Sequence, residues 1–328
     1  MRPNPLKPRL AAGGCAFGTM AFEFFTPGYP AICRAAGAEF ILYDMEHSGV
    51  GFETMKAQFA FCRGLDLVPL VRVPSGDYHH IARALDIGAM GIMVPMVETS
   101  EQAKAIVDCT KYPPAGRRGA AFNVAAHDDY AGGAETDKIA QANARTMVIA
   151  LVETATGIEN VDAIAAVDGV DVVWLGHYDL TNFLGIPGQF DHPKFHAAVD
   201  SLVQACEKHG KTPGFLAGDE KWARDFRAKG FRIIAYGVDV VWLGHYDLTN
   251  FMGIPGQFDN PKFHSAVDRL VKACQKHGKT PGFLAGDEKW ARDFRAKGFR
   301  MIAYGVDTLL MQRALADGIK LLQGTLKT

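Results

Sequence analysis

The chain has 328 residues, of which 48% are apolar and 22% are charged, and its formal net charge is −1 at pH 7. These values are ordinary for a globular protein, and they point to neither a nucleic acid nor a membrane surface as a partner. No run of eighteen apolar residues occurs, so no membrane-spanning helix is expected. The six cysteines stand singly, without a Cys-x-x-Cys pair. This pattern predicts buried free thiols in a cytoplasmic protein rather than a zinc site or disulfides.

Short apolar runs alternate along the chain with helical patterns. In chain order, the runs expected as strands are 14–19, 39–44, 67–72, 91–96, 147–152, 171–176, 213–217 and 231–236. The stretches expected as helices include 77–87, 100–110, 157–167, 193–208, 219–229 and 308–323. The strand runs are apolar almost throughout, as parallel strands buried on both faces should be. Eight such strands alternating with helices predict an α/β fold of the (β/α)₈ barrel type. A doubly wound open sheet is the alternative, but no Gly-x-Gly-x-x-Gly follows the first strand.

Residues 170–237 recur at 238–305 with a constant offset of 68 and no gaps. We call these two segments copy 1 and copy 2. Seven pairs of positions differ: Leu184/Met252, His192/Asn260, Ala197/Ser265, Ser201/Arg269, Gln204/Lys272, Glu207/Gln275 and Ile233/Met301. Gly-Val-Asp stands before copy 1, at the junction and after copy 2, so misaligned recombination at this tripeptide would insert one block. Without one copy, about 260 residues remain, which suits one large α/β domain.

Each copy holds the sixth, seventh and eighth predicted strands. At the junction an eighth strand stands directly before a second sixth strand, without the crossover that parallel neighbours need. A regular eleven-stranded barrel is therefore not expected. We predict a single barrel domain over residues 1–328, with eight strands and one repeat length in excess. Leaving a 68-residue segment outside the barrel as a loop costs about 4 kcal/mol in loop-closure entropy. The excess segment also exposes apolar strands, which is an aggregation hazard.

Charged side chains gather where the predicted strands end, which is the catalytic end of such a barrel. Glu153 and Asp179 end neighbouring strands. Two adjacent carboxylates repel unless a cation lies between them, so they indicate Mg²⁺ or Mn²⁺, with helix-capping acids as the alternative. His47 follows the second strand and is either a general base or the cap of a turn. Arg72 ends the third strand and either stabilises a developing enolate oxygen or forms a salt bridge with a nearby acid.

Several motifs together resemble the HpcH/HpaI aldolase family, the metal-dependent class II pyruvate aldolases. They are DMEH at 44–47, LVRVP at 70–74, ALDIGAMGIMVPMVET at 84–99, YPPAGRRG at 112–119, LVET at 151–154 and GHYDL at 176–180. Tyr-Pro-Pro-x-Gly-x-Arg-Gly in that order is specific, whereas DxEH alone is weak. The resemblance implies a TIM barrel, small 2-oxo acid and aldehyde substrates, and a homo-oligomer, often a hexamer.

The same resemblance implies the roles of individual residues. Glu153 and Asp179 would bind Mg²⁺, Mn²⁺ or a similar ion such as Co²⁺. His47, paired with Asp86, would support the base or its water, and Arg72 would hold the keto oxygen of pyruvate. Substrate contacts would come from Gly176, His177 and Tyr178, and the copy 2 equivalents of these and of Asp179 are Gly244, His245, Tyr246 and Asp247. The implied reaction cleaves 4-hydroxy-2-oxo acids to pyruvate and an aldehyde. A proline is common in the family where His177 stands, so the preferences for metal and aldehyde stay open.

Two other hypotheses remain. A CoA-thioester lyase of the related citrate-lyase type would share the Glu/Asp metal site, although the sequence shows no recognisable CoA pocket. A catalytically impaired duplication product would be a misassembled barrel, or an oligomer held together by swapped copies. For the metal site, Asp179 is favoured over Asp247, because copy 1 is synthesised first and follows the fifth helix directly.

Overall fold

The computed structural model describes residues 1–237, 242–243, 249, 252–276, 282–285, 288–297, 299, 301–304 and 307–324. Contacts divide the chain into two compact units. The barrel unit comprises Met1–Gly237 and Leu315–Thr328, and the satellite unit comprises Val238–Ala314. Each unit is described by itself, and the single domain expected over 1–328 stays a prediction. No helix in the described part of the chain is long and apolar enough to cross a membrane.

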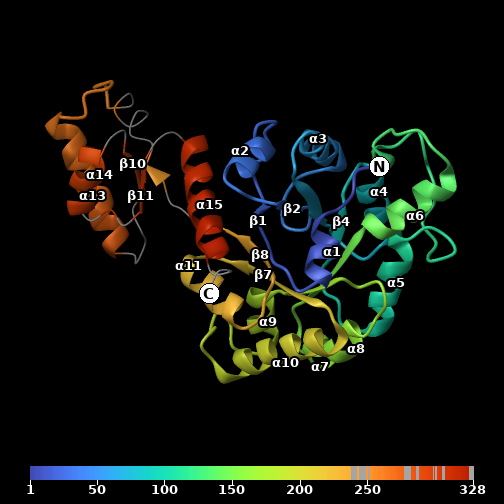
Figure 1. The fold of residues 1–328 in the computed structure, drawn as a ribbon. Helices are drawn as coiled ribbons and strands as arrows, with labels where there is room; N and C mark the ends of the chain where they lie inside the picture. The colour runs from blue at the N-terminus through green and yellow to red at the C-terminus, as the bar shows by residue number, and fades with distance from the viewer. Residues whose placement is uncertain are drawn as a thin grey trace. The chain divides into compact units, whose positions relative to one another are not determined.

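The barrel unit is built on eight parallel strands (Figure 1). They are β1 (Ala16–Ala21), β2 (Phe40–Asp44), β3 (Val68–Arg72), β4 (Gly91–Val94), β5 (Met147–Val152), β6 (Val172–Leu175), β7 (Thr212–Ala217) and β8 (Ile233–Tyr236). Each strand pairs with the next one along the chain, and β8 pairs with β1 to close the barrel. Every predicted strand is present, with ends within two residues of those expected. The predicted (β/α)₈ barrel is confirmed, and copy 1 supplies its last three strands.

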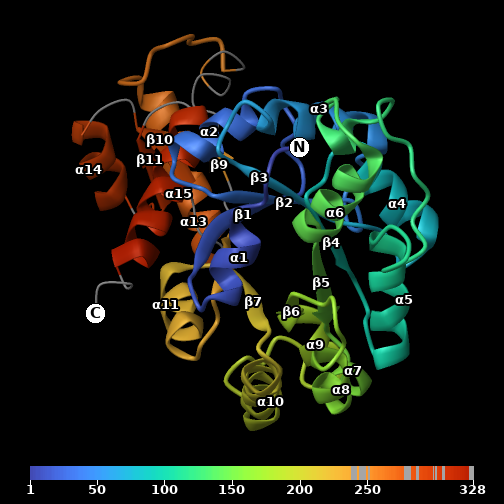
Figure 2. The same ribbon diagram turned by 45° about the vertical axis from the view of Figure 1, so that its right-hand side comes forward.

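Helix α1 precedes the first strand and packs against the barrel core, and the other helices follow the strands and lie around the outside of the barrel (Figures 1 and 2). They are α1 (Leu6–Ala11), α2 (Tyr29–Ala35), α3 (Phe52–Cys62), α4 (Tyr78–Asp86), α5 (Ser100–Thr110), η1 (Ala126–Asp128), α6 (Glu135–Arg145), α7 (Ala155–Glu159), α8 (Val161–Ala165), α9 (His177–Phe183), α10 (Pro193–His209) and α11 (Glu220–Ala228). Local sequence sets several of their ends. Thr99 and Gln102 form a capping box at the start of α5, which satisfies two backbone N–H groups. Gly210 ends α10 at φ 64°, a backbone conformation that favours glycine.

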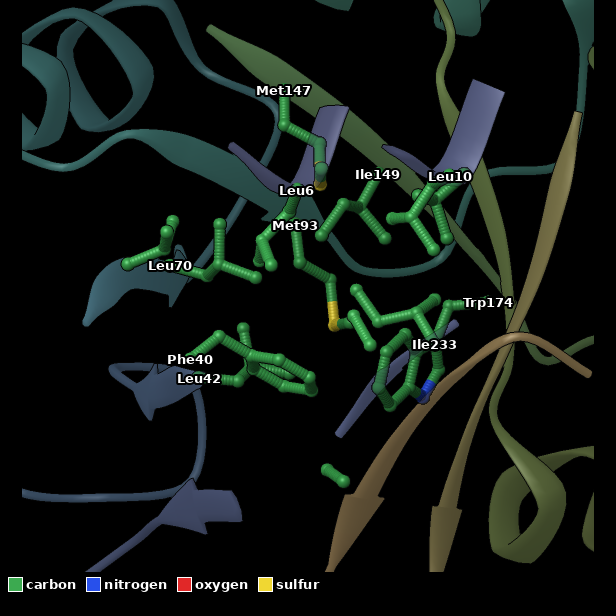
Figure 3. Packing of buried hydrophobic residues seen from close by; sticks show 14 of the residues in the cluster. Leu6, Leu10, Phe40, Leu42, Leu70, Met93, Met147, Ile149, Trp174 and Ile233 are labelled. Atoms are coloured by element: carbon green, nitrogen blue, oxygen red, sulfur yellow. The ribbon is translucent and has the colours of Figure 1, made fainter. Parts of the chain in front are cut away.

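The barrel interior is filled by side chains from alternate strand positions (Figure 3). Phe40 and Leu42 of β2 and Trp174 of β6 point inward, and Leu6 and Leu10 of α1 join the same cluster. Because successive strand residues face opposite sides, the residues between these positions face the surrounding helices. Burying one side chain such as Leu stabilises a fold by about 1.5–3 kcal/mol. The interior is therefore a packed core, and the chemistry is left to the strand ends.

The last helix, α15 (Asp307–Gly324), follows copy 2 in sequence, yet residues 315–324 belong to the barrel unit. A Cβ placed on Gly318 would lie 3.2 Å from the ring of Tyr236 in β8. Ile319 lies close to Gly37, where a Cβ would meet it at 3.3 Å. The end of the chain thus packs on the last strand of copy 1.

The described residues of the satellite unit repeat secondary-structure elements of copy 1. It contains α13 (Pro261–Lys276), α14 (Glu288–Ala296) and the strands β9 (Trp242–Leu243), β10 (Gly282–Ala285) and β11 (Met301–Tyr304). The strands form a parallel sheet in the order β11-β10-β9. A small apolar core lies in this unit and consists of Ile254, Phe263, Val267, Val271, Phe294 and Phe299. Copy 2 therefore builds a core of its own.

Candidate active site

A buried ion-pair network lies where β2 and β3 end. Asp44 and Arg72 are paired across these two strands, and the Arg72 Nε–H donates to Asp44 Oδ1 at 2.6 Å. Asp44 is fully buried, and Arg72 is 7% exposed. Glu46 Oε2 lies 3.0 Å from Arg72 Nη1. Two carboxylates therefore hold the guanidinium, and the salt bridge that was the alternative for Arg72 does exist.

Asp44 also fixes the loop that follows β2. Its carboxylate oxygens accept hydrogen bonds from the backbone N–H of Glu46 at 3.2 Å and of His47 at 3.0 Å. The backbone of His47 is thereby anchored, while its side chain is 59% exposed and its Nε2 lies 3.8 Å from Glu46 Oε2. Asp44 and Glu46 were not among the residues expected to have a role. The signal was present in the sequence, because Asp44 and Arg72 end neighbouring strands.

Glu153 follows β5 and is 3% exposed. Its Oε1 accepts a hydrogen bond from the backbone N–H of Met96 at 2.8 Å. A Cβ on Gly176, just after β6, would lie 2.4 Å from Glu153 Oε2. Gly176 therefore acts by leaving room for the Glu153 carboxylate. Thr154, whose hydroxyl accepts from the Gly157 N–H at 2.9 Å, caps α7, so the capping role considered for Glu153 belongs to its neighbour.

Burial raises the pKa of Glu153 to about 7, against the lowering effect of the Met96 hydrogen bond, and the charges of Glu46 and Asp179 raise it further. Burial also raises the pKa of Glu46, while Arg72 and His47 oppose that shift. Asp179 lies in the first turn of α9. The carboxylates of Glu46, Glu153 and Asp179 thus repel one another at the end of the barrel. A cation bound among them would relieve this repulsion.

These donors fit the divalent ion that the family resemblance implies. Glu153 and Asp179 offer hard oxygen atoms, and Gly176 clears the space that the buried Glu153 carboxylate occupies. No group of three or more His, Cys, Asp or Glu side chains forms a complete metal cage in the described ranges. Two carboxylates suit an ion such as Mg²⁺, which fills its remaining positions with water and substrate oxygens.

The expected pairing of His47 with Asp86 is not formed within the chain. Asp86 is the last residue of α4 and lies at the barrel end where β4 begins, whereas His47 follows the end of β2. Asp86 instead accepts from Arg118 Nη2 at 2.6 Å and lies 3.9 Å from His127 Nδ1. Helix α4 runs back along the barrel between these two positions, which separates them.

His177 begins α9 and is 5% exposed. The centroid of its ring lies 4.6–5.6 Å from those of Tyr178, Phe190, Phe215 and Trp222. Burial lowers the pKa of His177 to about 4, so the ring is neutral at neutral pH. Tyr178 is 61% exposed, so of these two residues it has the more accessible side chain. Their expected substrate contacts stay predictions, and the copy 2 equivalents Gly244, His245, Tyr246 and Asp247 lie outside the described residues.

Three of the exposed residues near the charged groups carry large apolar surfaces. Phe22 is 39% exposed, and its ring centroid lies 5.9 Å from Arg72 Cζ. Met96, whose backbone binds Glu153, is 41% exposed, and Tyr178 directly precedes Asp179. We call Phe22, Met96 and Tyr178 the apolar rim. A (β/α)₈ barrel with an arginine and paired carboxylates at the strand ends is compatible with a carbon–carbon lyase that uses a bound cation.

Comparison with known proteins specifies the class. The family model described as HpcH/HpaI aldolase/citrate lyase matches residues 24–241 and again residues 236–314. A 4-hydroxy-2-oxovalerate aldolase from Novosphingobium aromaticivorans is 39% identical over 224 residues, which cover 65% of this chain and 80% of that protein. A 5-keto-4-deoxy-D-glucarate aldolase from Klebsiella pneumoniae is 35% identical over 238 residues, covering 73% and 91%. The crystal structure of an HpcH/HpaI aldolase from Desulfitobacterium hafniense superposes with a TM-score of 0.69 and 30% identity, covering 79% and 98%.

The chain belongs to the HpcH/HpaI aldolase/citrate lyase family. The second match of the family model falls largely on copy 2, in agreement with the duplication read from the sequence. The predicted enzyme class, a class II aldolase that acts as a carbon–carbon lyase, is confirmed.

Proposed function

We propose that the chain cleaves 4-hydroxy-2-oxo acids to pyruvate and an aldehyde with the help of a divalent metal ion, and catalyses the reverse addition. The observation that carries this proposal is the arrangement of Arg72, clamped by Asp44, with the carboxylates of Glu153 and Asp179 at the end of the barrel. An arginine fixed before reaction stabilises charge that appears during reaction. The activities for which these relatives are named, both aldolases, agree in kind.

In the proposed cleavage the bond between C3 and C4 of the substrate breaks, and its electron pair moves toward C2, where negative charge appears on the former keto oxygen. The bound ion would act as a Lewis acid on the 2-oxo acid. Arg72 donates to the oxygen that gains charge. Because Asp44 and Glu46 already hold the guanidinium, little reorganisation is needed during the reaction.

The departing aldehyde requires removal of the proton from the 4-hydroxyl group. His47 is the group at this end of the barrel that suits the task, because imidazole exchanges protons near neutral pH. Its backbone is anchored on Asp44 while its ring remains accessible. The proton is returned when C3 of the enolate is protonated to give pyruvate.

The apolar rim supports an apolar aldehyde as the second product. Phe22, Met96 and Tyr178 expose large apolar surfaces next to the charged groups, and such surfaces gain free energy when an apolar ligand covers them. A polyhydroxylated or carboxylated aldehyde would instead need hydrogen-bonding partners there. In the addition direction, kcat/KM for pyruvate with propanal should exceed kcat/KM with glyoxylate, and Tyr178→Ala should reduce this ratio.

Pyruvate release from 4-hydroxy-2-oxo acids with Mn²⁺, and then with EDTA, tests the proposal. Glu153→Gln should lower turnover by about 10²–10³-fold or more, because one of the two carboxylates proposed to hold the charge-stabilising ion is lost. Glu159→Gln, a substitution of an exposed glutamate at the end of α7, is the matched control and should leave turnover unchanged. Turnover that survives both EDTA and Glu153→Gln would reject the metal-assisted aldolase. Cleavage of an acyl-CoA without release of pyruvate from 4-hydroxy-2-oxo acids would favour the CoA-thioester lyase instead.

A further inference from the structure

We propose that copy 1 and copy 2 are interchangeable in the barrel. Either copy can supply its sixth, seventh and eighth strands, so that the chain closes its active site with either one. In the structure, copy 1 supplies β6, β7 and β8, and copy 2 forms the satellite unit. In the alternative closure, copy 2 pairs with β5 and β1, and copy 1 is the segment left outside. Asp247 then takes the place of Asp179. Only this last consequence rests on the proposed function.

The pairing register of the satellite sheet supports the exchange. Gly282 pairs with Met301 and with Trp242 in the satellite unit, just as Gly214 pairs with Ile233 and with Trp174 in the barrel. Each of these pairs differs from its counterpart by the repeat offset of 68. A register slip of one residue would turn every side chain to the opposite face. Copy 2 thus holds the strand alignment that the barrel requires.

Contacts in the described loops and helices of copy 2 also match those of copy 1. The Thr249 hydroxyl accepts from the Gly256 N–H at 3.2 Å, as Thr181 accepts from Gly188 at 3.0 Å. Lys297 lies 3.3 Å from Asp268, and Lys229 lies 3.4 Å from Asp200. Asn260 accepts from the Lys262 N–H at 3.0 Å, the same bond that the different residue His192 makes with Lys194 at 3.1 Å. Copy 2 is therefore preformed for the place that copy 1 occupies.

The two outer strands of the satellite sheet correspond to the two strands that join copy 1 to the rest of the barrel. Strands β9 and β11 are the edges of that sheet. Their counterparts β6 and β8 pair with β5 and β1. Edge strands present unpaired backbone groups that favour pairing with another strand. Strand β5 has one free edge for the sixth strand, and β1 has one free edge for the eighth strand. The two copies therefore compete to pair with β5 and β1.

The free-energy difference between the two closures is small. Both leave one 68-residue segment outside the barrel, so the cost of loop closure is the same. Of the seven differing positions, 197, 201, 204 and 207 are exposed, and 184 and 192 are partly exposed. The remaining one, Ile233, is fully buried and corresponds to Met301. Because apolar exchanges of similar volume are well tolerated, the two closures should be populated within about tenfold of each other.

A cross-link between helices identifies the closing copy without any assay of activity. In the barrel unit Lys208 of α10 lies 2.9 Å from Asp162 of α8, and both side chains are more than half exposed. The counterpart of Lys208 in copy 2 is Lys276. We would compare Asp162→Cys/Lys208→Cys with Asp162→Cys/Lys276→Cys after refolding from denaturant, using a brief treatment with a short bismaleimide. Cys15, Cys33, Cys62, Cys109 and Cys206 are buried, and the chain without added cysteines is the control.

Peptide mass spectrometry and gel mobility then give the yield of each link. We expect a 162–276 link within one chain. Its yield should be no less than about a tenth of the yield of the 162–208 link. A lower yield overturns the proposal, because copy 1 alone then closes the barrel. A 162–276 link found only between two chains also overturns it and assigns copy 2 to exchange between molecules. The variant with the 162–208 pair carries the same number of surface changes and reports folding in every case.

Discussion

Copy 1 and copy 2 share nearly the same sequence and the same local contacts, yet copy 1 closes the barrel while copy 2 forms a separate three-stranded sheet. The difference between them therefore lies in what surrounds each copy. Strands, helix caps and register are decided within the 68-residue segment, whereas closure depends on the single edges that β5 and β1 provide. The comparison separates what the segment determines by itself from what the barrel adds.

The proposed active-site residues also divide into those that occur once in the chain and those that lie in the duplicated segment. Asp44, Arg72 and Glu153 occur once in the chain, but the second carboxylate proposed to bind the metal occurs twice, as Asp179 and Asp247. The residues proposed to stabilise developing charge thus have one source, and the carboxylate proposed to complete the metal site has two. Substitutions in the duplicated part and in the single part should have different consequences.

The largest expected effect comes from removing both copies of the carboxylate. Asp179→Ala combined with Asp247→Ala should lower metal-dependent pyruvate release by about 10³-fold or more, because one metal carboxylate remains. With interchangeable copies, Asp179→Ala alone should keep about a tenth of the activity or more, and Asp247→Ala should stay near wild type. If Asp179→Ala is as inactive as the double variant, copy 2 does not complete a working site.

Deleting residues 238–305 should raise the stability of the barrel. The deletion joins β8 directly to α15, whose last ten residues already pack beside Tyr236. It removes the closure of a 68-residue segment, which costs about 4 kcal/mol, and it also removes the competing copy. Urea denaturation should show a higher midpoint for the deletion variant. A midpoint equal to or below that of the full chain would mean that the satellite unit itself supports the barrel.

A smaller change in the free energy of unfolding is expected when the pH is lowered, because a buried histidine resists protonation. His127, outside both copies, is 1% exposed, and neither ring nitrogen has a hydrogen-bond partner. Burial first, and then the charge of Arg118, lowers the pKa of His127 from 6.5 to about 4. The unfolded chain therefore takes up a proton before the native state does, so stability is complete above pH 6.5 and falls as the pH decreases toward 4. The loss should reach about 3 kcal/mol.

His127→Phe should remove this part of the pH dependence, measured by urea denaturation between pH 4 and 7. His177 in copy 1 has the same lowered pKa of about 4, through burial alone, so a slope from His177 should remain in the variant. An unchanged slope in His127→Phe would show that the native His127 ring is protonated as readily as in the unfolded chain.

Much of this molecule could be predicted from its sequence because the decisive signals are local. Apolar runs located all eight barrel strands, and the ends of β5 and β6 brought Glu153 near Asp179. Features that depend on the pairing between strands were missed. Asp44 holds Arg72 because these two residues are aligned across β2 and β3, and Gly176 makes room for Glu153 across two neighbouring strands. Within the chain His47 and Asp86 are not paired, because α4 carries Asp86 back to the end of the barrel where β4 begins; the expected pairing stays a prediction.

The strands themselves give little basis for choosing between the copies, because the strands that compete are identical except at Ile233 and Met301; the order of the copies along the chain was the signal that favoured copy 1. This single buried difference gives the smallest and sharpest prediction. Ile233→Met makes the competing strands equal, so the ratio of the 162–276 to the 162–208 cross-link should change by less than about tenfold. Met301→Ile makes the strands equal in the opposite way and should bring the ratio to the same value. If the two variants give different ratios, the two closures do not place this residue in equivalent surroundings. If neither variant changes the wild-type ratio, the exposed positions of α10 and α13, and not the buried strand, determine which copy closes the barrel.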